Sequence, residues 1–241
     1  MQNKIIITRP IKDSVEIALE VSTRGFTPLI EPVLTVEYRP DALPEIATDI
    51  PLIFTSSNGV RAFAEKSNGR DHPVYTVGRN TADEARQAGF RNIESASGTI
   101  DDLVNLLTSE AKTGLTSAFY IRGRDISGDL KGILAKNGIN IDEFIAYNTD
   151  QVQNLTVNLL KSLDNREIKA VMLFSSRAGQ SFAELIEQYD RTYRMKAIKA
   201  LCISNAVLES VSALPFGDVL VADKPDRYGM IRLLEKLATA E

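Results

Sequence analysis

Side chains that can hold an anion recur along the sequence, each group following a short apolar run. They are Arg9, Thr55, Ser56, Ser57, Asn58, Gly78, Arg122, Gly123, Ser175, Ser176, Arg177 and Ser204. Hydroxyl and guanidinium groups donate hydrogen bonds to carboxylates and phosphates, and a glycine lets backbone N–H groups approach such an anion closely. The pattern therefore predicts sites for the negatively charged groups of a ligand.

A purely structural interpretation of the same residues is also open. Each Ser or Thr can cap the helix that follows it, and each Arg can be a solvated residue of a first helical turn. We favour the anion site because the groups recur after nearly every apolar run in both halves of the chain. The net charge of −4, from 28 Lys and Arg against 32 Asp and Glu, does not oppose it, since local potential governs the capture of an anion.

The composition argues against several other functions. An acidic chain with a pI near 5.3 is not expected to bind nucleic acid. One His and one Cys are too few for a zinc, haem or iron–sulfur site, so we expect chemistry without a metal. We expect His72 on the surface, in a polar loop, and Cys202 buried within a strand as a small apolar residue.

Motifs of three common enzyme classes are missing. The sequence contains no G-x-x-x-x-G-K-[ST], no G-x-G-x-x-G and no G-x-S-x-G. We therefore do not expect a P-loop NTPase, a nicotinamide-dependent enzyme or a serine hydrolase. The acidic pairs Asp101 with Asp102 and Asp125 with Asp129 are interpreted as helix caps rather than as acid–base pairs, since carboxylates favour the first turn of a helix.

The sequence around these anion-binding groups predicts an α/β fold with parallel sheets. Short runs rich in Ile, Val and Phe alternate with segments of helical periodicity, which is typical of parallel strands joined by helices. The predicted strands are 4–8, 51–55, 74–77, 118–121, 170–174, 200–203 and 218–221. Ligands of such sheets bind beyond the carboxyl ends of the strands, which is where the groups above fall.

An internal repeat predicts two such lobes. The matching segments are 52–65 with 172–184, 74–90 with 200–216, and 119–139 with 5–26. Because the third pair reverses the order, one repeat is circularly permuted relative to the other. We predict a discontinuous flavodoxin-like or Rossmann-like domain of 1–36 and 152–241, with a second α/β domain, 37–147, inserted in it. The alternative is that the halves share only the general appearance of βα units.

Two crossings must join the predicted domains. Residues 31–39 and 143–152 are extended in character and include Val33, Val36 and Tyr147, whose types favour strands. We therefore predict a two-stranded β-ladder between the lobes. A double connection favours hinge motion over free tumbling, and we expect the ligand in a cleft between the lobes.

The sequence shows no sign of export or of a membrane anchor. The apolar run 5–7 is far shorter than the core of a signal peptide, and no stretch approaches the roughly 18 apolar residues of a membrane span. We expect a cytoplasmic protein that makes no contact with a membrane.

The motifs, taken in order, resemble those of the uroporphyrinogen-III synthase family of tetrapyrrole biosynthesis over the whole chain. They are ITRP at 7–10, IEP at 30–32, FTSSNGV at 54–60, VG at 77–78, TA at 81–82, YIRG at 120–123, YNT at 147–149, FSSR at 174–177 and ADKP at 222–225. Each motif is weak alone, and the resemblance rests on their shared order and spacing.

The resemblance implies a cofactor-independent enzyme with two α/β lobes joined by a β-ladder. Its substrate would be hydroxymethylbilane, a linear tetrapyrrole whose eight carboxylates suit the predicted anion-binding edges. The family reaction loses the terminal hydroxyl as water and closes the macrocycle with inversion of ring D, through a spirocyclic intermediate, to give uroporphyrinogen III. For partners, the resemblance implies a monomer that receives its substrate in a transient hand-over from hydroxymethylbilane synthase.

The resemblance also assigns roles to single residues. Tyr147, on the second crossing, would donate a proton to the leaving hydroxyl, and Thr81 would contact a ring or a carboxylate. Hinge packing for Tyr147 and helix capping for Thr81 are the structural alternatives. The competing function is a non-catalytic two-lobed protein that closes on a small polyanionic ligand.

Overall fold

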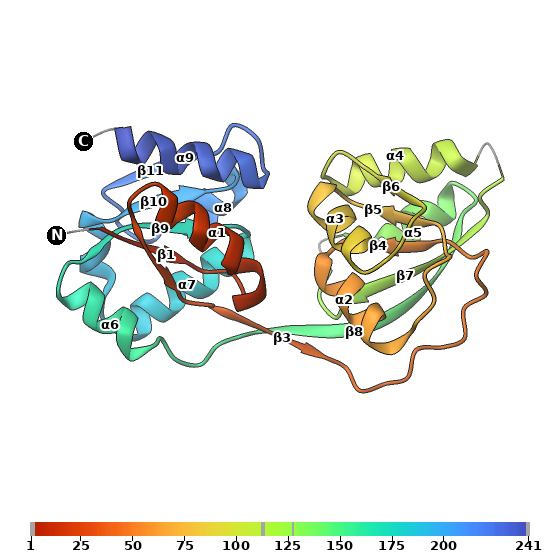
Figure 1. Ribbon diagram of the computed structural model, residues 1–241, viewed down its shortest axis with the longest axis horizontal. Helices are drawn as coiled ribbons and strands as arrows, with labels where there is room; N and C mark the ends of the chain where they lie inside the picture. Colours follow the sequence, from red (N-terminus) through yellow and green to blue (C-terminus); the bar gives the residue numbers. More distant parts are fainter. Residues whose placement is uncertain (1–2, 112–113, 127, 240–241) are drawn as a thin grey trace. The chain divides into compact units, whose positions relative to one another are not determined.

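The chain forms two structural units. The computed structural model describes residues 3–111, 114–126 and 128–239. Unit 1 comprises Met1–Thr35 and Asp150–Glu241, and unit 2 comprises Val36–Thr149 (Figure 1). The chain therefore leaves unit 1 after Thr35 and returns to it at Asp150.

Unit 1 contains a five-stranded parallel sheet in the order β11-β10-β9-β1-β2. Its strands are β1 (Lys4–Ile7), β2 (Thr27–Ile30), β9 (Ile168–Leu173), β10 (Lys199–Cys202) and β11 (Asp218–Val221). Ile6 of β1 pairs with Leu29 on one side and Val171 on the other. The central strands are nearly continuous apolar runs because helices cover both faces of the sheet.

Two layers of helices enclose this sheet (Figure 1). The helices are α1 (Ile11–Thr23), α6 (Val157–Asp164), α7 (Ser176–Gln188), α8 (Asn205–Ser210) and α9 (Arg227–Thr239), with the 3-10 helix η1 (Thr192–Ala197). α6, α7 and α8 share a core with Val171 and Leu173 on one face, and α1 and α9 share a core with Ile5 and Ile7 on the other.

Unit 2 is built on a six-stranded sheet in the order β3-β8-β7-β4-β5-β6. The strands are β3 (Leu34–Tyr38), β4 (Leu52–Phe54), β5 (Val74–Thr76), β6 (Ile93–Ser95), β7 (Ser117–Gly123) and β8 (Asn140–Gln151), and the helices are α2 (Ser57–Lys66), α3 (Arg79–Gln87), α4 (Ile100–Ala111) and α5 (Leu130–Lys136). α2 and α3 cover the face that carries Phe54, and α4 and α5 cover the face that carries Ile53. No helix of the described residues is long and apolar enough to cross a membrane.

The two sheets share one arrangement of strands. By position along the sheet, β9, β10, β11, β1 and β2 of unit 1 correspond to β4, β5, β6, β7 and β8 of unit 2. The helices agree, because α7 and α8 lie on one face of the first sheet and α2 and α3 lie on the matching face of the second. β1 opens the chain, whereas its counterpart β7 follows β4, β5 and β6. The circular permutation predicted from the repeat is therefore confirmed, as is the α/β class with two mainly parallel sheets.

The two crossing segments pair with each other. The backbone N–H of Arg39 donates to the carbonyl of Ala146 at 2.9 Å, and that of Val152 donates to the carbonyl of Val33 at 3.1 Å. The pairs move in opposite directions along the chain, so β3 and β8 are antiparallel. The predicted two-stranded ladder is present, and the rest of β8 continues beside β7 as part of the parallel sheet. The predicted domain limits, 1–36, 37–147 and 152–241, stay a prediction.

Three features differ from what the sequence predicts. β2 and β6 lie outside the predicted strands, because both are short edge strands without the apolar run of a central strand. His72 was expected on the surface but is buried. Its Nδ1 lies 3.0 Å from the carbonyl oxygen of Ile50 and its ring meets Phe63 edge-on. The polar neighbours of His72 in the sequence therefore wrongly suggest exposure. The ring can be buried because one of its nitrogens pairs with a backbone carbonyl and its carbon atoms pack against apolar side chains.

Cys202 behaves as the sequence predicts. It is fully buried in β10, and burial raises the pKa of its thiol to about 11. The thiol is therefore protonated at neutral pH and acts as a small apolar residue of the core.

Glu31 is a buried carboxylate that fixes the start of α6. Its Oε1 accepts a hydrogen bond from the backbone N–H of Thr156 at 2.7 Å, and its Oε2 accepts one from the Thr156 hydroxyl at 2.5 Å. Thr156 in turn caps α6 by accepting from the backbone N–H of Leu159 at 3.2 Å. The IEP motif thus has a structural role, because it joins the end of β2 to the helix that resumes unit 1.

We predict that Glu31→Ala lowers the free energy of unfolding by about 1–3 kcal/mol, because it removes the two hydrogen bonds that hold Thr156 at the start of α6. Urea denaturation followed by circular dichroism measures the change. Glu37→Ala, on an exposed position of β3, is the control and should change the value by less than about 0.5 kcal/mol. Equal stability of the two variants would contradict the proposed capping role.

Candidate functional site

A pair of hydroxyl groups lies at the carboxyl ends of two neighbouring strands in unit 2. Thr55 directly follows β4, and its Oγ1 lies 2.8 Å from the hydroxyl oxygen of Tyr120 on β7. β4 and β7 are adjacent, and the chain continues from them to opposite sides of the sheet. Such a topological switch point is where doubly wound sheets bind their ligands.

Tyr147 reaches the same edge because β8 carries an extra residue. Arg122 pairs with Ile145, but the next residue, Gly123, pairs with Tyr147, so Ala146 is the extra residue of a β-bulge. Ala146 and Tyr147 consequently contribute to the same core cluster, although successive residues of a regular strand point to opposite faces. The bulge thus directs the Tyr147 ring toward the α2 side of the sheet, next to Gly123.

Gly123 makes room for the Tyr147 ring. A Cβ atom at position 123 would lie 2.9 Å from Cε2 and Cζ of Tyr147 and 3.1 Å from its hydroxyl oxygen. The backbone N–H of Arg124 donates to the carbonyl of Tyr147 at 2.9 Å and holds the two strands together beyond the bulge. Only glycine at position 123 therefore leaves the ring where it is.

Burial controls the protonation of both tyrosines. It raises the pKa of Tyr147 above the ordinary value near 10, while the Ser56 side chain and the Gly123 backbone oppose the rise. Burial likewise raises the pKa of Tyr120, where Thr55 opposes the rise and the nearby Tyr147 adds to it. Both hydroxyls therefore keep their protons at neutral pH and can donate a hydrogen bond to a ligand.

The start of α2 brings the predicted residues of the TSSN motif together. Ser56 is the N-cap, and its Oγ accepts from the backbone N–H of Asn58 at 3.1 Å. The Ser57 hydroxyl donates to the carbonyl of Asn80 at 3.4 Å and so joins the loops that follow β4 and β5. The structural interpretation thus holds for the Ser56 oxygen, while the Ser56 hydroxyl proton remains a donor at the Tyr147 edge.

Two glycines allow close approaches of the backbone in unit 2. A Cβ at Gly59 would lie 2.9 Å from the carbonyl oxygen of Ile121, and one at Gly78 would lie 3.2 Å from Cα of Gly98. Thr81 is buried in the first turn of α3, where its backbone N–H donates to the carbonyl of Gly78 at 3.1 Å. Gly78 and the first turn of α3, which contains Thr81, therefore follow β5, the strand beside β4.

Arg122 is engaged by groups of the protein. Its Nε donates to Oε1 of Glu143 at 2.9 Å, and its Nη1 donates to the carbonyls of Gly123 at 2.9 Å and Arg124 at 3.2 Å. The guanidinium thus braces the turn that follows β7 and meets a carboxylate of the chain itself. Its predicted contact with a ligand carboxylate stays a prediction.

The corresponding edge of unit 1 carries Arg9. Arg9 follows β1, and its guanidinium lies over the ring of Phe174, 5.0 Å from the centroid, and 3.5 Å from Oδ2 of Asp13. Phe174 follows β9, so Arg9 spans the switch point between β1 and β9. The buried Thr8 joins the same two strands, because its hydroxyl donates to the carbonyl of Met172 at 2.9 Å.

Four further predicted residues lie at this edge of unit 1. Ser175 is the N-cap of α7 and accepts from the backbone N–H of Ala178 at 3.2 Å. Ser176 and Arg177 are exposed in the first turn of the same helix. Ser204 is at the N-cap position of α8 without a side-chain capping hydrogen bond. Ser175 therefore has the capping role, and the other three present polar groups at the surface.

Two residues of the site were not singled out from the sequence. Tyr120 forms half of the hydroxyl pair, and Glu143 holds Arg122. Tyr120 lies two residues before Arg122 in the same strand, and this spacing places both side chains on one face. The sequence could therefore have indicated Tyr120 through its spacing from a predicted site residue. Nothing in the sequence indicates the pairing of Arg122 with Glu143, because it depends on the register between β7 and β8.

Two of the four acidic side chains predicted to be helix caps, Asp102 and Asp129, have that role, whereas Asp125 lies outside the helices and 3.5 Å from Nε of Arg124. Asp102 accepts from the backbone N–H of Thr99 at 3.2 Å and from its hydroxyl at 2.7 Å, and Asp129 accepts from the backbone N–H of Gly132 at 2.8 Å. Over the part of the chain that the structure describes, no group of three or more His, Cys, Asp and Glu side chains is arranged to hold a metal ion.

The sequence is similar to a known protein family and to a curated protein of that family. The family model described as uroporphyrinogen-III synthase HemD matches residues 15–232. The porphyrin biosynthesis protein HemD of Ruminiclostridium josui is 26% identical over 249 residues, which cover 96% of this chain and 48% of that protein. The chain thus spans about half the length of this curated relative.

Two solved structures share the fold. The uroporphyrinogen-III synthetase of Helicobacter pylori aligns with a TM-score of 0.64 at 19% identity, covering 98% of this chain and 99% of that one. A mutant uroporphyrinogen III synthase of Thermus thermophilus aligns with a TM-score of 0.55 at 18% identity, covering 99% and 100%. At these identities the likeness shows the two-sheet fold.

The buried tyrosines predict a loss of stability at high pH. Their pKa values are higher in the folded protein than in the unfolded chain, so their contribution is fully present below about pH 10 and is lost as the pH rises through the folded values. We expect the free energy of unfolding to fall above pH 10, and to fall less steeply in the double variant Tyr120→Phe/Tyr147→Phe. Urea denaturation at several pH values between about 8 and 11 measures both slopes.

The comparison between the two proteins isolates these two hydroxyls. Tyr75 and Cys202 also have raised pKa values, but they are present in both proteins and their effects cancel. Tyr228→Phe, at a side chain that is 60% exposed, should leave the wild-type slope unchanged. Identical slopes in the wild type and the double variant would show that burial does not hold these protons.

Proposed function

The chain belongs to the uroporphyrinogen-III synthase family, and we propose that it catalyses the family reaction on a linear tetrapyrrole at the carboxyl edge of the unit 2 sheet. The substrate is hydroxymethylbilane, which loses its terminal hydroxyl as water and closes to uroporphyrinogen III with inversion of ring D. The observation that carries the proposal is the match of the family model over residues 15–232. The placement of Tyr147 beside the β4–β7 switch point supports the choice of edge.

Tyr147 is the proposed proton donor of the first step. The bond between the terminal methylene carbon and its hydroxyl breaks, and the departing oxygen must gain a proton to leave as water. A hydroxyl whose pKa is raised by burial holds its proton at neutral pH and offers it only to a group that is becoming basic, as this oxygen does. The positive charge left on the pyrrole is delocalised over the ring and its nitrogen, so that a single positioned donor suffices.

The remaining task is to hold one conformation of a flexible chain. The bilane closes without help to the wrong isomer, so the enzyme must favour ring inversion by positioning rather than by strong acids or bases. We assign this role to hydroxyls and N–H groups at the carboxyl edges of the two sheets, namely Thr55, Ser56, Ser57, Asn58, Gly78, Thr81, Arg122 and Gly123 in unit 2 and Arg9, Ser175, Ser176, Arg177 and Ser204 in unit 1. Their number fits a substrate with eight carboxylates.

The proposal includes a monomer in the cytoplasm that receives its substrate from hydroxymethylbilane synthase, as the family resemblance implies. Hydroxymethylbilane cyclises spontaneously, so a short path between the two enzymes would limit the loss to the wrong isomer.

The decisive experiment gives the purified chain freshly generated hydroxymethylbilane and separates the oxidised type I and type III uroporphyrins by chromatography. We expect type III to dominate and to form at a rate proportional to the protein concentration. Type I at the rate of the protein-free blank, from a chain shown to be folded by circular dichroism, would overturn the proposal. Saturable binding without turnover would then favour a non-catalytic binding protein.

We predict that Tyr147→Phe lowers kcat by about tenfold to a thousandfold, the contribution of one positioned proton donor. The free energy of unfolding should change by less than about 1 kcal/mol, because the ring is retained. The same isomer assay measures the rate, and Tyr228→Phe, at an exposed side chain, is the matched control. A rate equal to that of the wild type would assign Tyr147 to packing alone.

We predict that Gly123→Ala lowers activity by about tenfold or more, because the added methyl group must displace the Tyr147 ring. Gly128→Ala is the matched control, since a Cβ at Gly128 meets nothing within 4 Å, and it should retain wild-type activity. The isomer assay and a thermal melt of each variant separate a displaced ring from an unfolded chain. Full activity of Gly123→Ala would mean that the observed ring position is not needed for catalysis.

A further inference from the structure

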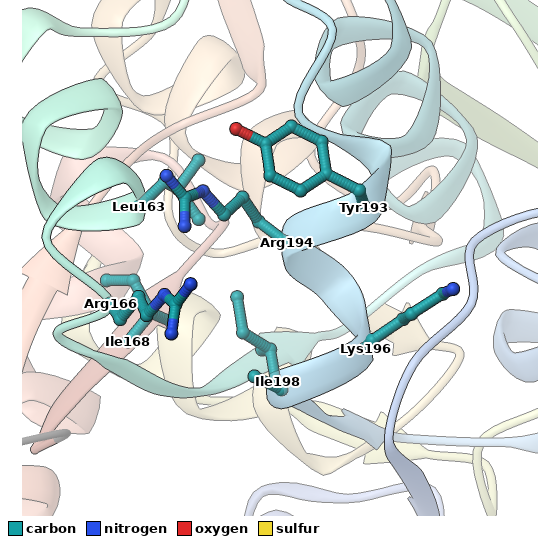
Figure 2. A pocket seen from close by; sticks show the side chains of 8 residues that line it. Leu163, Arg166, Ile168, Tyr193, Arg194, Lys196 and Ile198 are labelled. Carbon is teal, nitrogen blue, oxygen red and sulfur yellow. The ribbon is translucent and has the colours of Figure 1, made fainter.

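A pocket of about 270 Å³ lies in unit 1 at the amino ends of two strands (Figure 2). Its lining residues are Leu163, Arg166, Ile168, Tyr193, Arg194, Lys196, Ala197 and Ile198. Ile168 is the first residue of β9, and Ile198 immediately precedes β10. The pocket is therefore at the edge of the sheet opposite to Arg9 and Ser175, and the proposed function does not use it.

The lining combines an apolar floor with a cationic rim. Leu163, Ile168 and Ile198 are buried core residues. Figure 2 shows the guanidinium groups of Arg166 and Arg194 on one side of the pocket, whereas the Lys196 amine points away from them. A small organic anion matches both parts, because its apolar body can cover the floor while its charged group meets the guanidiniums.

The positive charge at this pocket is only partly balanced. Asp164 lies 2.9 Å from Nε of Arg191 and 3.7 Å from a terminal nitrogen of Arg194. Nε of Arg194 is buried without a hydrogen-bond partner, and no carboxylate of the described residues pairs with Arg166. Asp164 thus pairs with two arginines, Arg191 and Arg194, and leaves Arg166 without a paired carboxylate in the part of the chain that the structure describes, although the net charge of the chain is −4. Such a local excess of cations favours the capture of an anion.

Arg166 occupies a backbone conformation that disfavours it. Its φ is +57°, in the left-handed region, and it follows the end of α6. In the same position after α1, α3 and α5 the chain has Gly25, Gly89 and Gly138, each with positive φ. Glycine is the usual residue there because it has no Cβ. An arginine kept in a glycine position is an outlier that indicates a role for its side chain.

We propose that this pocket is a second ligand site, which binds a small organic anion with an apolar or aromatic body and one carboxylate or phosphate group. Arg166 and Arg194 form the hydrogen bonds to the charged group. Leu163, Ile168 and Ile198 contact the body, and the exposed Tyr193 ring at the rim covers it.

The test titrates the full chain with phenyl phosphate and follows the backbone amides by ¹H–¹⁵N NMR. We expect saturable shifts confined to residues 163–168 and 193–198, with a Kd on the order of 1 mM for a ligand of this size. Phenol and inorganic phosphate, each carrying half of the recognised chemistry, should bind at least about tenfold more weakly. Shifts spread over other surfaces, or equal affinity for inorganic phosphate, would overturn the proposal.

Two glycine variants separate binding from folding. Arg166→Gly should weaken the binding of phenyl phosphate about tenfold or more while raising Tm, because glycine suits the backbone there. Asp190→Gly is the matched control: Asp190 has φ +52° at the end of α7, so its replacement should also raise Tm but leave the affinity undiminished. Unchanged affinity in Arg166→Gly would refute the role of Arg166, and it could not be ascribed to a damaged fold.

Discussion

The bulge at Ala146 is the constraint on which the candidate site depends. Without the extra residue, Gly123 would face Ala146, and Tyr147 would point to the opposite side of the sheet, because side chains alternate along a strand. With it, Tyr147 joins the α2 side and its ring lies against the one residue that has no Cβ to displace it. The position of the proposed proton donor therefore depends jointly on the β7–β8 register, on Gly123 and on Tyr147. A change in any of the three would move the hydroxyl.

The same edge also shows how capping and ligand binding can share residues. Ser56 and Ser175 occupy equivalent places in the permuted repeat, after β4 and β9, and each accepts a backbone N–H of the helix that it starts. A cap satisfies one of the four unpaired N–H groups at a helix start and uses the serine oxygen as an acceptor. Other N–H groups of these helix starts remain as donors, and the Ser56 hydroxyl also interacts with Tyr147. The two interpretations of these serines are thus compatible.

The sequence predicts the parts of this fold that depend on local patterns. Apolar runs predict seven strands and the α/β class, because a strand buried on both faces is a nearly continuous apolar segment of the sequence. The likeness of FTSSN to FSSR predicts the permuted repeat. The edge strands β2 and β6 carry no such run. The sequence predicts which edge of the sheet holds the site, but it does not predict which side chains are in contact there. The bulge, the Thr55–Tyr120 pair and the Arg122–Glu143 pair depend on the register between strands, and register is a property of tertiary packing. His72 shows the converse error, because polar neighbours do not prevent one ring from being buried.

The two edges of the unit 1 sheet favour charges of opposite sign, because the helices on it all run in the same direction relative to the strands. Helices begin at the carboxyl edge, where their positive dipole ends favour anions, and they end at the amino edge, where their negative ends favour cations. The negative dipole ends of α6 and α7 thus explain why positively charged side chains lie near positions 166 and 191–194. The dipole requires only a positive charge near the helix end, however, and any exposed lysine could supply it. It does not explain why the residue at φ +57° is an arginine when the ends of α1, α3 and α5 have glycine there. A ligand that needs that guanidinium beside an apolar floor does explain it.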